Sequence, residues 1–218
     1  MSTLGTLGAG HIGSALARVA LDAGHDVVLS NSRGPASLAD LVAELVARPT
    51  SRGSVRAATA PEAAEAADLA VVAVPLHALG QVPVAPLAGK VVIDTGNYYP
   101  QRDGRIPDLD ERRATSSELL QRHLPTSSVV KAFNHIAAAQ IVEHRSPAGT
   151  EHRRALVVAG DDVAARGRVA AFIDELGFDV VELGPLADSW RIEPGTPGYG
   201  AEDDAEQLRA HLSAAVRI

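Results

Sequence analysis

The feature that most constrains the fold of this chain is the sequence Gly8-Ala9-Gly10-His11-Ile12-Gly13 near its start. It follows an apolar, strand-like run over residues 3–7 and precedes residues 12–23, where apolar side chains recur at helical spacing. A G-x-G-x-x-G sequence at such a junction is typical of dinucleotide binding, because glycine permits a tight turn and lets the backbone approach a pyrophosphate. The N–H groups at the helix start would receive the anion. The predicted cofactor-binding residues of this turn are Gly8, Gly10, His11, Ile12 and Gly13.

The rest of the chain alternates between strand-like and helix-like segments. Further strands are expected at residues 26–30, 54–58, 69–74, 90–94, 128–133, 155–159 and 178–183. Helices are expected at residues 38–47, 61–67, 116–123, 136–143, 162–176 and 204–216. Strands that alternate with helices are joined by right-handed crossovers and form a sheet covered on both faces. The predicted fold class is α/β, a Rossmann-type, doubly wound and mainly parallel sheet with a short C-terminal loop-plus-helix appendage.

The end of the second predicted strand indicates which dinucleotide is bound. NAD-specific proteins place a carboxylate there, which accepts a hydrogen bond from the ribose 2′-hydroxyl. This strand ends in Ser30-Asn31-Ser32-Arg33, and the next acid is Asp40. Ser32 can donate a hydrogen bond, and Arg33 can pair with a phosphate in a bidentate way. We therefore predict NADP(H) as the cofactor, with Asn31, Ser32 and Arg33 in its site; a solvated loop arginine is the alternative.

Polar side chains follow three more predicted strands, at residues 74–77, 94–99 and 133–135. Ligands of open α/β sheets bind outside the carboxyl ends of the strands, so these segments should meet the nicotinamide. The predicted cofactor contacts here are Val74, Pro75, His77, Asn97 and Asn134, and the candidates for positioning the reactants are His77, Asn134 and His135. The alternatives are that Asn97 shapes a turn and that the histidines are structural or exposed.

Composition limits the kinds of partner and the cellular compartment that are expected for this chain. The net charge is −7, and scattered Lys and Arg residues give no footprint for nucleic acid or an anionic membrane. The absence of cysteine excludes disulfides, thiolate nucleophiles and cysteine-based zinc sites, and it fits a reducing compartment such as the cytoplasm. The chain has no apolar run of spanning length, and no histidines have metal-ligand spacing, so we predict neither a membrane span nor a metal site.

The composition of the chain changes near residue 193. A segment rich in proline and glycine begins there, and it cannot form regular secondary structure. We expect two parts. Residues 1–193 would form the NADP-binding Rossmann domain, and residues 194–218 would form a loop and helix packed on that domain or on a dimer partner. A homodimer is expected only by analogy with proteins that pair their C-terminal elements.

Four segments together resemble the NADPH-dependent deazaflavin (coenzyme F420) reductase family. They are the glycine turn, Asn31-Ser32-Arg33, Val130-Lys131-Ala132-Phe133-Asn134 and Gly184-Pro185-Leu186-Ala187-Asp188-Ser189. The chain is also similar to the oxidoreductase domain of the six-transmembrane epithelial antigen metalloreductases. The resemblance covers about the first 190 residues in register.

The resemblance implies hydride transfer between NADPH and a deazaflavin or flavin ring, which would be the small-molecule electron acceptor. It also implies that Ser32 and Arg33 grip the 2′-phosphate and that Pro75 and His77 flank the nicotinamide. Residues 184–189 would lie on the wall of the acceptor pocket.

The chain departs from the family at several positions. Asn134 stands where the deazaflavin reductases carry a histidine, and His135 replaces a more usual threonine. Trp190-Arg191-Ile192-Glu193 and the following loop replace the apolar C-terminal helices that complete the deazaflavin pocket. The membrane helices of the metalloreductases are absent from this sequence.

Hydride transfer between stacked rings needs aligned carbons about 3–3.5 Å apart, and no side-chain acid or base is required. The sequence agrees, since it shows no Tyr-x-x-x-Lys pair, nucleophile or carboxylate dyad. Two alternatives stay open. A carbonyl or imine reductase would need a proton donor, for which the candidates are His77, His135, Lys131 and Tyr98. A non-catalytic NADP(H)-sensing module would bind the cofactor without turnover.

Overall fold

The computed structural model describes residues 2–217, which contain an eight-stranded sheet of order β3-β2-β1-β4-β5-β6-β7-β8. The strands are β1 (Thr3–Leu7), β2 (Asp26–Ser30), β3 (Val55–Ala57), β4 (Leu69–Val72), β5 (Val91–Asp94), β6 (Ser128–Lys131), β7 (Ala155–Gly160) and β8 (Asp179–Gly184). Neighbouring strands pair in parallel except β6 and β7, which are antiparallel. The predicted Rossmann-type, mainly parallel α/β fold is confirmed.

Helices connect the strands, and several begin or end at residues suited to that role. The helices are α1 (His11–Ala23), α2 (Ala39–Ala47), α3 (Ala60–Ala66), α4 (Pro100–Asp103), α5 (Pro107–Asp110), α6 (Ser116–His123), α7 (Ala138–Glu143), α8 (Val163–Leu176) and α9 (Ala205–Ala214), with 3₁₀ segments η1 (Pro35–Leu38), η2 (Leu76–Gln81), η3 (Ala85–Leu87) and η4 (Leu186–Ile192). The helix α1 ends at Gly24, whose φ of 95° is accessible to glycine without strain. The carboxylate of Asp162 caps α8 by accepting from the N–H groups of Ala164 and Ala165.

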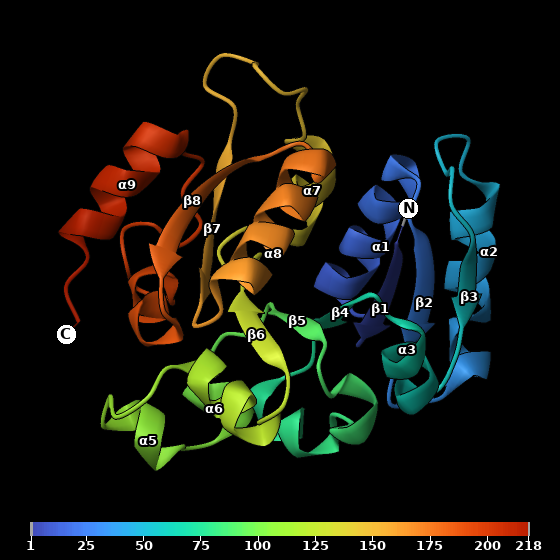
Figure 1. Ribbon diagram of the computed structural model, residues 1–218, viewed down its shortest axis with the longest axis horizontal. Coiled ribbons are helices and arrows are strands. Elements are labelled where there is room, and N and C mark those ends of the chain that lie inside the picture. The colour runs from blue at the N-terminus through green and yellow to red at the C-terminus, as the bar shows by residue number, and fades with distance from the viewer. Residues whose placement is uncertain (1, 218) are drawn as a thin grey trace.

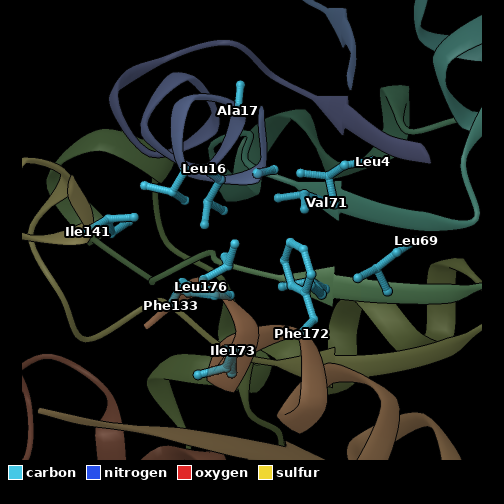
Figure 2. Packing of buried hydrophobic residues seen from close by; sticks show 14 of the residues in the cluster. Leu4, Leu16, Ala17, Leu69, Val71, Phe133, Ile141, Phe172, Ile173 and Leu176 are labelled. Carbon is cyan, nitrogen blue, oxygen red and sulfur yellow. The ribbon is translucent and has the colours of Figure 1, made fainter. Parts of the chain in front are cut away.

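The two faces of the sheet carry different helices. On one face, α1, α2, α7 and α8 pack their apolar side chains against the sheet. Figure 2 shows Leu16 of α1 and Phe172 of α8 in the same cluster as Leu4 and Val71 of the sheet. On the other face, α3 and α6 cover the sheet through Ala63 and Leu120, among others. Burying each large apolar side chain stabilises the fold by about 1.5–3 kcal/mol. Coverage of both faces explains why the strands are almost continuously apolar.

Residues 194–217 pack back onto the same chain. Leu208 and Leu212 of α9 contact Val157 and Val181 of the sheet, and the N–H of Ala155 donates to the carbonyl of Asp203 at 2.9 Å. Figure 1 shows α9 beside β8, at the opposite end of the molecule from β3 and α2. The boundary between residues 193 and 194 stays a prediction. Within residues 2–217, no helix has both the length and the apolar character needed to cross a membrane.

Two strands end two residues earlier than the sequence predicts. The expected strands over 69–74 and 128–133 end at Val72 and Lys131, because apolar residues continue beyond the last ladder hydrogen bonds. Phe133 is fully buried but has a φ of 59°, a left-handed conformation that ends the extended run. The short helices α4 and α5 were not expected from the sequence, although each begins at a proline.

Candidate functional site: a pocket at the carboxyl ends of β1, β2 and β4

A pocket of about 540 Å³ lies where β1, β2 and β4 end. Its walls are residues 7–10, 30–33, 73–75, 77–78 and 81–83, with Ala60. This is the edge of an open α/β sheet at which ligands bind. The predicted site residues that line it are Gly8, Gly10, Asn31, Ser32, Arg33, Val74, Pro75 and His77. No acidic side chain is among the described residues that form these walls.

The three glycines of the turn differ in what surrounds them. A Cβ on Gly8, whose φ is 108°, would overlap with the carbonyl oxygen of Ala73, and a Cβ on Gly13 would overlap with the carbonyl oxygen of Gly8. A Cβ on Gly10, which lines the pocket, would meet no atom within 4 Å and so would face open space. Gly8 and Gly13 thus permit close packing, and Gly10 leaves room for a ligand.

The helix α1 begins at this turn without a side-chain cap. Its N-cap residue is Gly10, and no acidic side chain lies in its first turn. The first N–H groups of a helix have no intrahelical partner, and they attract anions together with the helix dipole. His11 and Ile12 contribute to this first turn, but they do not line the pocket walls. The arrangement fits a bound pyrophosphate.

The segment after β2 forms a turn held by its own side chains. Asn31 Oδ1 accepts from the N–H of Arg33 at 3.0 Å, and Asn31 Nδ2 donates to Ser37 Oγ at 2.9 Å. Asn31 therefore shapes the turn. Ser32 and Arg33 are exposed, and no carboxylate of the described chain lies within 4.0 Å of the Arg33 guanidinium. The guanidinium is thus available to an anionic ligand.

Asn97 and Asn134 are hydrogen-bonded to each other, and neither residue lines the pocket. Asn97 Nδ2 donates to the carbonyl of Asn134 at 2.7 Å, and Asn134 Nδ2 donates to Asn97 Oδ1 at 3.1 Å and to the carbonyl of Ile192 at 2.8 Å. Both residues are buried, and the pair joins the ends of β5 and β6 to η4. Only Oδ1 of Asn134 lacks a partner within the described residues, so a single acceptor remains on this pair for a ligand.

His135 lies in the core rather than at the pocket. Its Nε2 accepts from the N–H of Val157 at 3.0 Å. Burial, assisted by the positive charge of Arg154, lowers the pKa of His135 to about 4, so the ring is neutral near pH 7. The ring of His135 is fully enclosed beside β7 and does not line the pocket, and its role in positioning the reactants stays a prediction.

Two other candidate proton donors are also hydrogen-bonded to groups of the same chain. Lys131 Nζ is fully buried and donates to Asp94 Oδ2 at 3.2 Å, Ser116 Oγ at 2.8 Å and the carbonyl of Gly96. These three contacts use all the donors of the ammonium group. Tyr98 Oη donates to Asp110 Oδ1 at 2.7 Å, and burial together with this contact raises its pKa. Of the four candidates, only His77 lines the pocket.

Sequence reasoning missed several residues of the site. Ala60, Gln81, Val82 and Pro83 line the pocket but belong to residue types that carry no binding signal by themselves. Asp103 also escaped notice; its side chain is fully buried and its Oδ1 lies 3.2 Å from Nδ1 of His77. The two residues are 26 positions apart, and only the pairing of β4 with β5 brings their segments together.

The buried His135 predicts a specific pH dependence of stability. The unfolded chain takes up a proton near the ordinary pKa of 6.5, whereas the folded protein does so only near 4. Between these values the unfolded state binds more protons, so stability falls as the pH is lowered. From about pH 7.5 to about pH 5.5, His135 should remove about 1.3 kcal/mol of unfolding free energy.

The His135→Gln variant should lack this contribution, because glutamine can still accept from Val157 but does not titrate. Urea unfolding at both pH values would measure the difference between the two proteins. An equal loss of stability in both proteins would contradict the assignment.

The chain is similar to several known proteins. Residues 3–98 match the family model "NADP oxidoreductase coenzyme F420-dependent". The F420-dependent NADP reductase of Methanothermobacter marburgensis is 31% identical over 213 residues, covering 90% of this chain and 89% of that protein. Two further relatives match over part of their length: YjhV of Escherichia coli (42% identity, 53% of that protein) and the metalloreductase STEAP3 of Rattus norvegicus (29% identity, 20% of that protein).

Two solved structures share the fold over most of this chain. A hypothetical protein from Sinorhizobium meliloti superposes with a TM-score of 0.79 at 34% identity, covering 94% of this chain and 96% of its own. A candidate F420-dependent NADP reductase from Arthrobacter sp. FB24 gives a TM-score of 0.70 at 29% identity and 87% coverage of both chains. With the glycine turn and the pocket in place, the similarity to the Methanothermobacter reductase along nearly the whole chain shows that this protein belongs to the family of coenzyme F420-dependent NADP oxidoreductases.

Proposed function

We propose that this protein is an NADPH-dependent oxidoreductase that transfers a hydride between the nicotinamide and a deazaflavin or flavin-like acceptor. The observation that carries the proposal is the composition of the pocket. An uncapped helix N-terminus, an available guanidinium at Arg33 and walls without an acidic side chain suit a ligand with several negative charges.

The residues of the pocket fit the parts of NADP(H). The open space at Gly10 and the start of α1 would accept the pyrophosphate, and Ser32 and Arg33 would hold the 2′-phosphate. Pro75 and His77 follow β4, on the other side of β1 from Arg33, and would adjoin the nicotinamide half. When bound, NADPH supplies the hydride, and the chain supplies orientation.

The engaged side chains favour hydride transfer without a protein acid. Lys131 and Tyr98 donate to other groups of the chain, and Nε2 of His135 accepts from the N–H of Val157. A carbonyl or imine reductase would need one of them, or His77, to deliver a proton. Reduction of a deazaflavin or flavin ring places no such demand on the protein, because the ring accepts the hydride and exchanges its proton with solvent.

The proposal is tested by mixing the purified protein with NADPH and the deazaflavin coenzyme, with a flavin nucleotide in a parallel cell. The expected result is rapid loss of the NADPH absorbance with the deazaflavin, and a slower reaction when NADH replaces NADPH. NADPH that binds but is not oxidised by either acceptor would contradict the proposal and favour the sensing module or another substrate.

A further inference from the structure

The pocket contains a histidine supported by a buried carboxylate. His77 lies in η2, directly after β4, and its side chain is 51% exposed on the pocket wall. Asp103 is the last residue of α4, which follows β5, and its carboxylate has no exposed surface. The Nδ1 atom of His77 and the Oδ1 atom of Asp103 are 3.2 Å apart. The imidazole therefore keeps Nε2 free of this contact.

Asp103 is held as a carboxylate by its surroundings. Its Oδ2 accepts from Nη2 of Arg102 at 2.8 Å and from the N–H of Tyr99 at 3.1 Å. Burial alone would raise the pKa of Asp103, but these contacts, with a smaller contribution from His77, lower it to about 2. A carboxylate in this place accepts a hydrogen bond from Nδ1–H of His77 and fixes the orientation of the ring.

The charges of the pocket match those of a phosphorylated dinucleotide. Among the described residues that line it, only Arg33 and His77 can carry a positive charge. They follow β2 and β4, the two strands that flank β1 and its glycine turn. The 2′-phosphate and the pyrophosphate are the two anionic groups of NADP(H). Arg33 suits the 2′-phosphate, and the pyrophosphate at the glycine turn would lie between the strand ends that carry Arg33 and His77.

We propose that His77, positioned by Asp103, is a second phosphate ligand of this pocket and that its protonated imidazole binds the pyrophosphate. Asp103 is a positioning residue in this arrangement, since it contacts His77 and not the pocket space. The inference rests on the proposed function only in that the pocket binds NADP(H). It adds that nucleotide affinity depends on the charge of one histidine.

The affinity should therefore rise as the pH is lowered. Histidine is the side chain whose charge changes between about pH 5 and 8. The charged group that faces His77 from a neighbouring element is Asp103 of α4, with Arg102 behind it. His11, in the first turn of α1, is the other histidine near the glycine turn and has to be tested separately.

The test is a calorimetric titration of the full-length protein with NADH and with NADPH at about pH 6 and about pH 8.5. NADH is essential, because it lacks the 2′-phosphate, which itself changes charge in this range. We expect both nucleotides to bind about tenfold more tightly at the lower pH. His77→Gln should bind both nucleotides with the weaker affinity at both pH values. Asp103→Asn should move the pH midpoint of binding downward.

The matched control is His152→Gln. His152 also pairs with a carboxylate, that of Asp204 at 2.8 Å, but it is 76% exposed and does not line the pocket. Its removal should leave the pH profile unchanged. His11→Gln should retain the tenfold change; loss of the change in this variant, with its retention in His77→Gln, would overturn the inference.

The outcomes separate this inference from the proposed function. NADH affinity that is independent of pH in the unmodified protein overturns the role of His77, while oxidation of NADPH by the deazaflavin would still stand. Failure of NADPH to bind at any pH overturns both. If thermal unfolding shows that Asp103→Asn does not fold, the His77→Gln profile decides alone.

Discussion

Replacing Gly10 with leucine should abolish the binding of both NADPH and NADH while the protein stays folded. The backbone of Gly10 has a φ of −78° and a ψ of −161°, which any residue adopts, and a Cβ would contact no protein atom within 4 Å. The added side chain would instead occupy the space beside the start of α1. We expect affinity for either nucleotide to fall by at least about 100-fold, or about 2.7 kcal/mol, measured by calorimetric titration.

The matched control for this experiment is Gly13→Ala. There a Cβ would overlap with the carbonyl oxygen of Gly8, so the turn or the helix has to move. This variant should lose about 3 kcal/mol of stability, whereas leucine at Gly10 should cost about 1 kcal/mol through poorer helix capping. Thermal unfolding of both variants distinguishes the two roles. Undiminished nucleotide binding by Gly10→Leu would mean that the turn does not face the pyrophosphate.

Replacing Arg33 with alanine should weaken the binding of NADPH far more than that of NADH. The guanidinium is exposed on the pocket wall, without a carboxylate partner in the described chain, and would make charge-assisted hydrogen bonds to the 2′-phosphate. The loss should be about 1.5–3 kcal/mol for NADPH, or roughly 10- to 150-fold in Kd, and close to zero for NADH.

The Arg33→Lys variant refines this test. Lysine keeps the charge but loses the bidentate geometry, so its affinity for NADPH should lie between those of the unmodified protein and the alanine variant. Neither substitution should alter thermal stability, because the side chain is exposed. Equal losses of affinity for both nucleotides in Arg33→Ala would contradict the assignment of the 2′-phosphate to this residue.

The local parts of the site were predictable because each depends on residues close together in the sequence. The glycine turn needs a strand before it and a helix after it, and both lie within the first 23 residues. The absence of an acid after β2 is likewise visible in the sequence around Arg33. Apolar runs alternating with helical spacing were enough to predict the doubly wound sheet, and Gly24 marked the end of α1 as glycine commonly does.

The sequence could not show that β7 runs antiparallel to β6, because an apolar run looks the same in a parallel and an antiparallel strand. The same limit applies to side chains that follow the strands. His135 and His77 are both histidines placed after a strand, yet one accepts a hydrogen bond from the backbone of β7 and the other lines the pocket. The partners of the two histidines, Val157 and Asp103, lie 22 and 26 positions away in the sequence.

By itself, then, the sequence determined the fold class, the place of the glycine turn between β1 and α1, and the presence of an arginine and no acid directly after β2. Local backbone preferences and nearest neighbours carry those signals. Only the tertiary structure decided which polar groups are available to a ligand. The pairing of Asn97 with Asn134, the enclosure of Lys131 and the carboxylate of Asp103 behind His77 all arise where β4, β5 and β6 end side by side. The physical reason is that a buried polar group must find a partner, and the partner is chosen by the strand order and not by distance along the chain.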